Sequence, residues 1–123
     1  MGMDPEKRAR HQEKIQKLYH SYRERMAVEL VGLGELASRL EGTEGDREVL
    51  MALRQQLHTI AGSGGTFGQV GLGEQARFLE LTLVSWLNAP LLELNTEERH
   101  RLAESLAALP GMLIDTDAII PSK

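Results

Sequence analysis

Residues 50–68 read L-M-A-L-R-Q-Q-L-H-T-I-A-G-S-G-G-T-F-G, and this stretch decides which fold the chain can adopt. Its apolar and small residues recur every three or four positions, the spacing of one face of an α-helix. That face comprises Leu50, Leu53, Leu57, Ile60, Gly64 and Phe67. His58 stands about 100° around the helix from Leu57, at the edge of the apolar face. We therefore predict a helix that buries one face and places a histidine beside a cluster of glycines.

The segment before this helix predicts another, longer helix. Asp4-Pro5-Glu6 is typical of a helix start, with Asp4 as N-cap and Pro5 at the first helical position. Apolar residues then follow at helical spacing as far as Leu40. The helix is long, and Gly32 and Gly34 mark the place where it could bend or divide.

The remaining segments predict a turn and two further helices. Residues 42–45 indicate a turn, and Asp46 is the expected cap of the helix that contains His58. Residues 68–73 contain three glycines and are expected to form the next connection. The helix after it carries Leu72, Ala76, Leu79, Leu83, Trp86 and Leu87. Asn88-Ala89-Pro90 is expected to end that helix, Asn95 or Thr96 to cap the last one, and Pro110-Gly111 to end it.

Four amphipathic helices and no alternating segment predict an all-α fold. With short connections, the expected arrangement is an antiparallel, up-down-up-down four-helix bundle. A length of 123 residues suits a single domain, spanning residues 1–123. Residues 112–123 include the apolar patch Ala118-Ile119-Ile120, which either packs on the domain or belongs to a tail or linker.

Composition narrows the classes of function. The chain has no cysteine, which excludes disulfides, thiolate zinc sites and cysteine nucleophiles. Residues 1–26 carry seven lysines and arginines against four acids, whereas the other residues carry seven against fourteen. An acidic body argues against nucleic acid as a partner. No apolar run reaches membrane-spanning length and no signal core precedes the first helix, so we expect no membrane contact and a cytoplasmic location.

The glycines beside His58 need an explanation, because glycine destabilises a helix. Gly62, Gly64 and Gly65 would each cost up to ~1 kcal/mol relative to alanine. The simplest benefit is access, since a macromolecule can approach an imidazole that is surrounded by bare backbone. A histidine at a core edge is by itself more often a satisfied polar residue, and a glycine cluster is more often a loop. Neither interpretation explains why the histidine and the glycine cluster occur together.

The pattern His58-x-x-x-Gly62-x-x-Gly65-Thr66-Phe67-Gly68 resembles the phosphorylation-site motif of the histidine phosphotransfer (HPt) family. It is especially similar to the phosphotransfer domain of chemotaxis histidine kinases. The likeness is strongest over residues 53–80 and continues through Leu72, Glu74, Ala76, Leu79 and Glu80. It implies a four-helix bundle in which an exposed His58 accepts a phosphoryl group. His58 would exchange that group with an aspartate of a receiver domain, in a response regulator or a hybrid kinase. The implied role is that of a carrier in a phosphorelay and not of a self-contained enzyme, although the chain could be a fragment of a histidine kinase.

The resemblance also assigns roles to residues around His58. Glu80 would orient the imidazole, as a glutamate does in the chemotaxis domains. Three residues after the histidine the family usually has lysine or arginine, whereas this chain has Ala61. Arg77, or failing that Arg54, could supply the missing cation; alternatively the partner supplies it, or the activity is lost. The bare surface expected to receive a receiver domain comprises Ala61, Gly62, Ser63 and Gly65.

Rival functions have weaker support. Gly71-x-Gly73-x-x-Ala76 matches a dinucleotide fingerprint, but that motif has meaning only between a strand and a helix. The four histidines are scattered, so we expect neither a metal nor a cofactor. The serious alternative is a helical interaction module that binds a receiver or another partner without being phosphorylated. Possible partners also include the catalytic domain of a histidine kinase.

Overall fold

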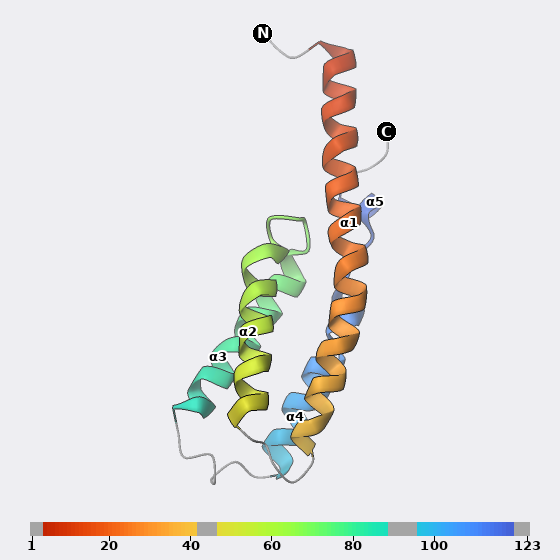
Figure 1. Cartoon of the computed structure of the whole chain (residues 1–123). Helices are drawn as coiled ribbons and strands as arrows, with labels where there is room; N and C mark the ends of the chain where they lie inside the picture. The colour runs from red at the N-terminus through yellow and green to blue at the C-terminus, as the bar shows by residue number, and fades with distance from the viewer. Residues whose placement is uncertain (1–3, 42–46, 89–95, 120–123) are drawn as a thin grey trace.

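The computed structural model describes residues 4–41, 47–88 and 96–119, and within these ranges it is helical, with no strand. The helices are α1 (Pro5–Ser38), α2 (Arg47–Gly64), α3 (Val70–Leu87), α4 (Thr96–Ala107) and α5 (Thr116–Ile119). Two short 3-10 helices, η1 (Arg39–Glu41) and η3 (Leu109–Met112), follow α1 and α4. The prediction of an all-α fold is confirmed (Figure 1). The predicted turn at 42–45 and the caps at Asp46 and Asn95 lie outside the described residues.

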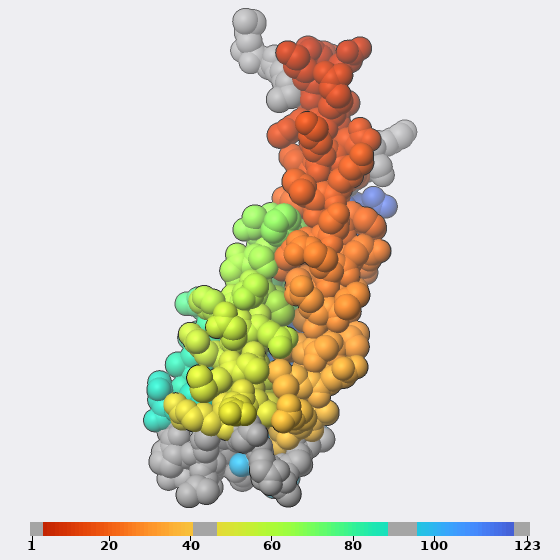
Figure 2. Space-filling view, in the orientation of Figure 1, coloured from red at the N-terminus to blue at the C-terminus, as the bar shows by residue number. Residues whose placement is uncertain are grey.

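α1 begins as its sequence predicts. The Asp4 carboxylate accepts hydrogen bonds from the backbone N–H groups of Glu6 and Lys7, at 2.8 and 3.2 Å. The helix then continues without interruption through Gly32 and Gly34, so the expectation that it could divide there is wrong. An added Cβ at either glycine would meet nothing within 4 Å, which means that neither glycine is needed for a close contact. The first turns of α1 project beyond the other helices (Figures 1 and 2).

The core lies between the helices and consists mainly of leucine. The predicted apolar face of α2 is buried, including Leu50, Leu53, Leu57 and Ile60. Buried side chains of the other helices meet it, and these include Tyr22, Met26, Leu30, Leu33, Leu72, Leu79, Leu83, Leu102 and Leu106. Burial of this apolar surface is the main force that holds the helices together.

α2 and α3 pack closely because two glycines face each other where the chain turns. An added Cβ at Gly64 would lie 2.9 Å from both the Gln69 carbonyl oxygen and the Gly73 Cα. The chain turns through residues 65–69, where Gly68 has a φ of 82°, a conformation that favours glycine. α3 already begins at Val70, so the prediction that residues 68–73 form the connection is wrong for residues 70–73. Gly71 and Gly73 are helical.

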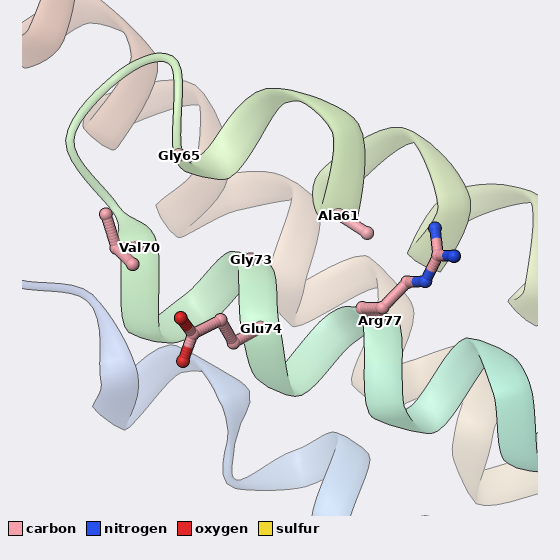
Figure 3. Close-up of a pocket in the computed structure, with 6 residues that line it drawn as sticks. All are labelled: Ala61, Gly65, Val70, Gly73, Glu74 and Arg77. Atoms are coloured by element: carbon pink, nitrogen blue, oxygen red, sulfur yellow. The ribbon is translucent and has the colours of Figure 1, made fainter.

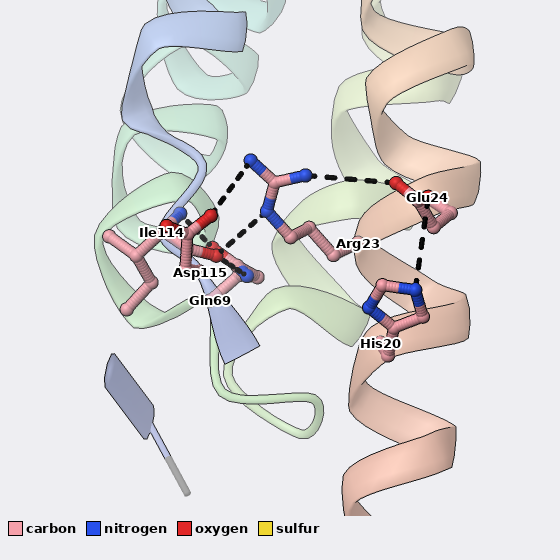
Figure 4. Close-up of polar contacts among 6 residues, drawn as sticks. All are labelled: His20, Arg23, Glu24, Gln69, Ile114 and Asp115. Atoms are coloured by element: carbon pink, nitrogen blue, oxygen red, sulfur yellow. Dashed lines mark hydrogen bonds and ion pairs between the residues drawn. The ribbon is translucent and has the colours of Figure 1, made fainter. Parts of the chain in front are cut away.

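The segment after α4 folds back on the turn between α2 and α3. The buried Gln69 side chain donates a hydrogen bond to the Ile114 carbonyl at 2.9 Å and accepts one from the Ile114 N–H at 3.0 Å. Arg23 of α1 also donates to the Ile114 carbonyl, at 3.1 Å, and forms an ion pair with Asp115 at 3.3 Å (Figure 4). Ile119 lies over Gly68. Residues 113–119 are therefore attached to both α1 and the α2–α3 turn.

Candidate functional site

His58 lies on the outer side of α2, because the buried leucines fix how that helix is rotated. Leu57 is fully buried, whereas the His58 side chain is 58% exposed. Its Nδ1 lies 2.7 Å from Oε2 of Glu80 on α3. The hydrogen bond therefore crosses between two helices and holds the imidazole in one orientation, while the other ring nitrogen takes no part in this bond.

Glu80 is placed very differently from its partner. Its side chain is only 7% exposed, and Oε1 is buried with no hydrogen-bond partner among the described residues. An ionised carboxylate can only accept hydrogen bonds, so when Glu80 is ionised and the imidazole is neutral, the proton of the ring is on Nδ1. Nε2 then has a free lone pair. The arrangement can act as a nucleophile toward a group that reaches the imidazole from outside.

The surface on the C-terminal side of His58 has few side chains. Gly62 is exposed, and an added Cβ at Gly62 or Gly65 would meet nothing within 4 Å. Ala61 and Gly65 line an open hollow of about 410 Å³ between α2 and α3, together with Val70, Gly73, Glu74 and Arg77 (Figure 3). The structure thus brings Ala61, Gly65 and Arg77 to one surface, one to two turns from His58.

Ser63 is the predicted surface residue that lies elsewhere. Its hydroxyl donates to the Thr59 carbonyl at 3.0 Å and lies 2.7 Å from the Tyr22 hydroxyl of α1. Ser63 thus packs against α1 and does not share the surface that contains Ala61 and Gly65. Arg54, the second predicted cation, lines a separate hollow with Arg47, Met51, Val84 and other residues.

Tyr22 is a notable residue that the sequence alone did not single out. It is buried and its ring stacks on Phe67, with 4.7 Å between the ring centroids. Burial raises the pKa of the Tyr22 hydroxyl, and the hydrogen bond with Ser63 only partly offsets that effect. Tyr22 and Ser63 are 41 positions apart, so helical periodicity could reveal that Tyr22 is buried but not which residue it bonds.

The described residues contain no group of three or more histidine, cysteine or acidic side chains that could hold a metal ion. Among the helices of these residues, none is both long and apolar enough to cross a membrane.

Comparison with known proteins gives one family. The model of the Hpt domain matches residues 17–112, a range that includes His58, Glu80 and the hollow between α2 and α3. The comparisons with curated proteins and with solved structures return no match. The matched range covers most of the chain, leaving out the first turns of α1 and all of α5. The chain therefore belongs to the Hpt domain family.

Proposed function

We propose that this protein is a phosphoryl carrier of a two-component phosphorelay in which His58 is the acceptor. Hpt domains perform histidine phosphotransfer and are carriers rather than catalysts. The observation that carries the proposal is the pairing of an exposed His58 with a buried Glu80, 2.7 Å from Nδ1. Glu80 is the one buried carboxylate among the described residues, whereas Glu24 and Glu104, which pair with His20 and His100, are exposed.

The proposed donor is the phosphoaspartate of a receiver domain. The Nε2 lone pair of His58 attacks phosphorus, an N–P bond forms, and the bond between phosphorus and the aspartate oxygen breaks. The aspartate leaves as a carboxylate, and the Nδ1 proton stays shared with Glu80 throughout. The reverse reaction regenerates the phosphoaspartate. Glu80 favours the reactive tautomer before the attack and stabilises the positive charge that the ring gains during it.

The proposed docking surface is the one with few side chains beside His58. Ala61, Gly62 and Gly65 let a receiver bring its aspartate close to the imidazole. A surface poor in charge suits the core of an interface, and a modest interface suits a partner that must dissociate after transfer. We also infer that α1 to α4 form the antiparallel four-helix bundle, of the type found in chemotaxis kinases, that presents this surface.

One observation favours a second function. Position 61 holds alanine where lysine or arginine is usual in the family, so the domain could bind receivers without accepting phosphate. In that case His58 would be a contact residue. The two functions share the fold and the docking surface and differ only in whether His58 reacts.

A phosphoryl-transfer assay distinguishes the carrier from the interaction module. The protein would be mixed with phosphorylated receiver domains from its own source, and acid-labile, base-stable label on it would be measured. The chemical control is His58→Gln; a matched control is His100→Gln, which changes another exposed histidine. Label that disappears only in His58→Gln would support the carrier. Binding of receivers without label would support the interaction module, and label retained by His58→Gln would refute the proposed acceptor.

A further inference from the structure

The absence of a lysine or arginine at position 61 leaves few cations that could reach a phosphoryl group on His58. α2 and α3 together contain three arginines and no lysine: Arg47, Arg54 and Arg77. Arg47 lies eleven positions before His58 and donates a hydrogen bond to the Leu87 carbonyl at 3.2 Å, at the far end of both helices. Arg54 and Arg77 are the remaining candidates on these helices.

The two arginines lie on opposite sides of His58 along α2. Arg77 is exposed and lines the same hollow as Ala61, one turn C-terminal to His58. Arg54, one turn N-terminal to His58, is half-buried and lines a hollow whose other residues lead back toward Arg47 and Leu87. Only Arg77 therefore shares a surface with Ala61 and Gly65, the small residues that make His58 accessible.

The direction of the Arg77 side chain strengthens this distinction. In Figure 3 the Arg77 side chain extends from α3 toward α2 beside Ala61, on the side away from Gly65. Because α2 runs from Ala61 to Gly65, this is the side on which His58 precedes Ala61. The Glu74 carboxylate points toward the opposite end of the hollow, near Val70. No hydrogen bond or ion pair within the described part of the chain engages the Arg77 guanidinium, so it is available to a ligand.

We propose that the phosphoryl-binding cation of this domain has moved from α2 to α3, with Arg77 reaching across the space that Ala61 leaves. This inference rests on the proposed function and adds to it the group that binds the transferred phosphate. A phosphoryl group brings close to two negative charges, and a guanidinium can hold two of its oxygens at once. A long side chain at position 61 would enter the space beside Arg77. The small residue at 61 and the arginine at 77 thus form one arrangement.

The test compares transfer rates of single and double variants, using the same phosphorylated receiver domain throughout. Arg77→Ala is expected to slow transfer to His58 on the order of tenfold to a hundredfold, the usual effect of losing hydrogen bonds to a charged group. Ala61→Lys in the Arg77→Ala background restores the cation from α2 and is expected to recover most of the rate. Arg101→Ala, which removes an exposed arginine of α4 paired with Glu97, is expected to leave the rate unchanged.

A second readout separates binding of the phosphoryl group from a general loss of activity. Removing Arg77 should also shift the equilibrium of label from His58 toward the receiver aspartate by a similar factor, and the Ala61→Lys change should shift it back. An unchanged rate in Arg77→Ala, or a loss in Arg54→Ala alone, would overturn the inference and leave the carrier function intact. Absence of label on the unmodified protein would instead refute the proposed function itself.

Discussion

At the scale of single residues, the pair of His58 and Glu80 combines exposure with fixed orientation. As the proposed phosphoryl acceptor, the imidazole needs solvent access to meet a partner, and its reactive tautomer needs a hydrogen-bond acceptor in a fixed position. Glu80 suits the second need because it is a buried residue of α3, with its side chain only 7% exposed. A carboxylate in the solvent would exchange freely between partners, so a buried one suits the orienting role that we propose for Glu80.

Glu80→Gln should keep the fold and slow transfer to His58. The amide oxygen can still accept a hydrogen bond from the Nδ1–H group, but the amide can also donate to an unprotonated Nδ1, so it no longer favours one tautomer. It also lacks the negative charge that would stabilise the ring during attack. We expect a loss on the order of tenfold to a hundredfold, the range that is found for carboxylates that orient metal-ligating histidines. Nitrogen NMR of the His58 ring should show a shift toward the other tautomer. Glu35→Gln, an exposed glutamate of α1, is the control and should change neither quantity.

Tyr22 gives a prediction about pH. Because burial raises its pKa in the folded state, the unfolded chain ionises first, near pH 10. The contribution of Tyr22 to stability is therefore complete below about pH 10 and declines above it. At pH 7, Tyr22→Phe should lower the free energy of unfolding by about 1 kcal/mol, because the hydrogen bond with Ser63 is lost. Urea unfolding should show this difference shrinking above pH 10, and a constant difference would contradict the assigned cause.

At the scale of elements, α2 carries glycines with two different functions. A Cβ added at Gly64 would point toward α3 and collide with backbone atoms 2.9 Å away. Gly64 therefore sets the distance between the two helices. Gly62 faces the solvent, and a Cβ there would meet nothing within 4 Å. Packing therefore explains Gly64 but not Gly62, and the reason for Gly62 has to be sought outside the domain.

Gly62→Val should leave the fold intact and block transfer. Valine is a better helix residue than glycine, and it has open space at this position, so stability should not fall. Its branched side chain would, however, occupy the surface on which a receiver is proposed to dock. Gly32→Val is the matched control, because Gly32 is also a helical, exposed glycine with open space around it, on α1. Normal transfer by Gly62→Val would refute the role of bare surface in docking.

Sequence patterns identified the buried faces of the elements better than they identified their ends. The cap at Asp4 and the buried leucines of α2 follow from rules that involve only neighbouring residues, and both are confirmed. The start of α3 was predicted too late, because Gly71 and Gly73 resemble loop residues when read locally. Gly73 is helical and faces Gly64 at close range, which is a property of two helices together and not of either alone.

At the scale of the whole molecule, contacts between distant segments were the part that the sequence could not predict. Gln69 and Ile114 are 45 positions apart, and nothing in the local pattern of either indicates the other. Ser63 was predicted for the surface beside His58, but its bond with Tyr22 of α1 places it elsewhere. The proximity of His58 and Glu80 was expected only because of the family resemblance, and their chemical roles stay predictions.

Gln69→Ala should loosen the attachment of residues 113–119 to the rest of the molecule. It removes both hydrogen bonds to Ile114 and should lower the free energy of unfolding by about 2 kcal/mol. Hydrogen exchange at the Ile114 amide should become faster, while amides in the centre of α2 keep their protection. Gln55→Ala, an exposed glutamine of α2, is the control. Unchanged exchange at Ile114 would mean that Arg23 and Asp115 hold the segment without Gln69.

The orientation of His58 determines how a partner could detect whether this residue is phosphorylated. The nitrogen that joins α2 to α3 is the one bonded to Glu80, and the proposed phosphoryl group would be attached to the other, on the outside. Gaining or losing that group would leave the hydrogen bond between the two helices in place, so the packing of the core would stay the same. Phosphorylation would change the chemistry of the surface at His58 and not the conformation of the domain. A partner could therefore detect the phosphoryl group only by contacting the surface at His58. The affinity of proteins that bind elsewhere on the domain would not change.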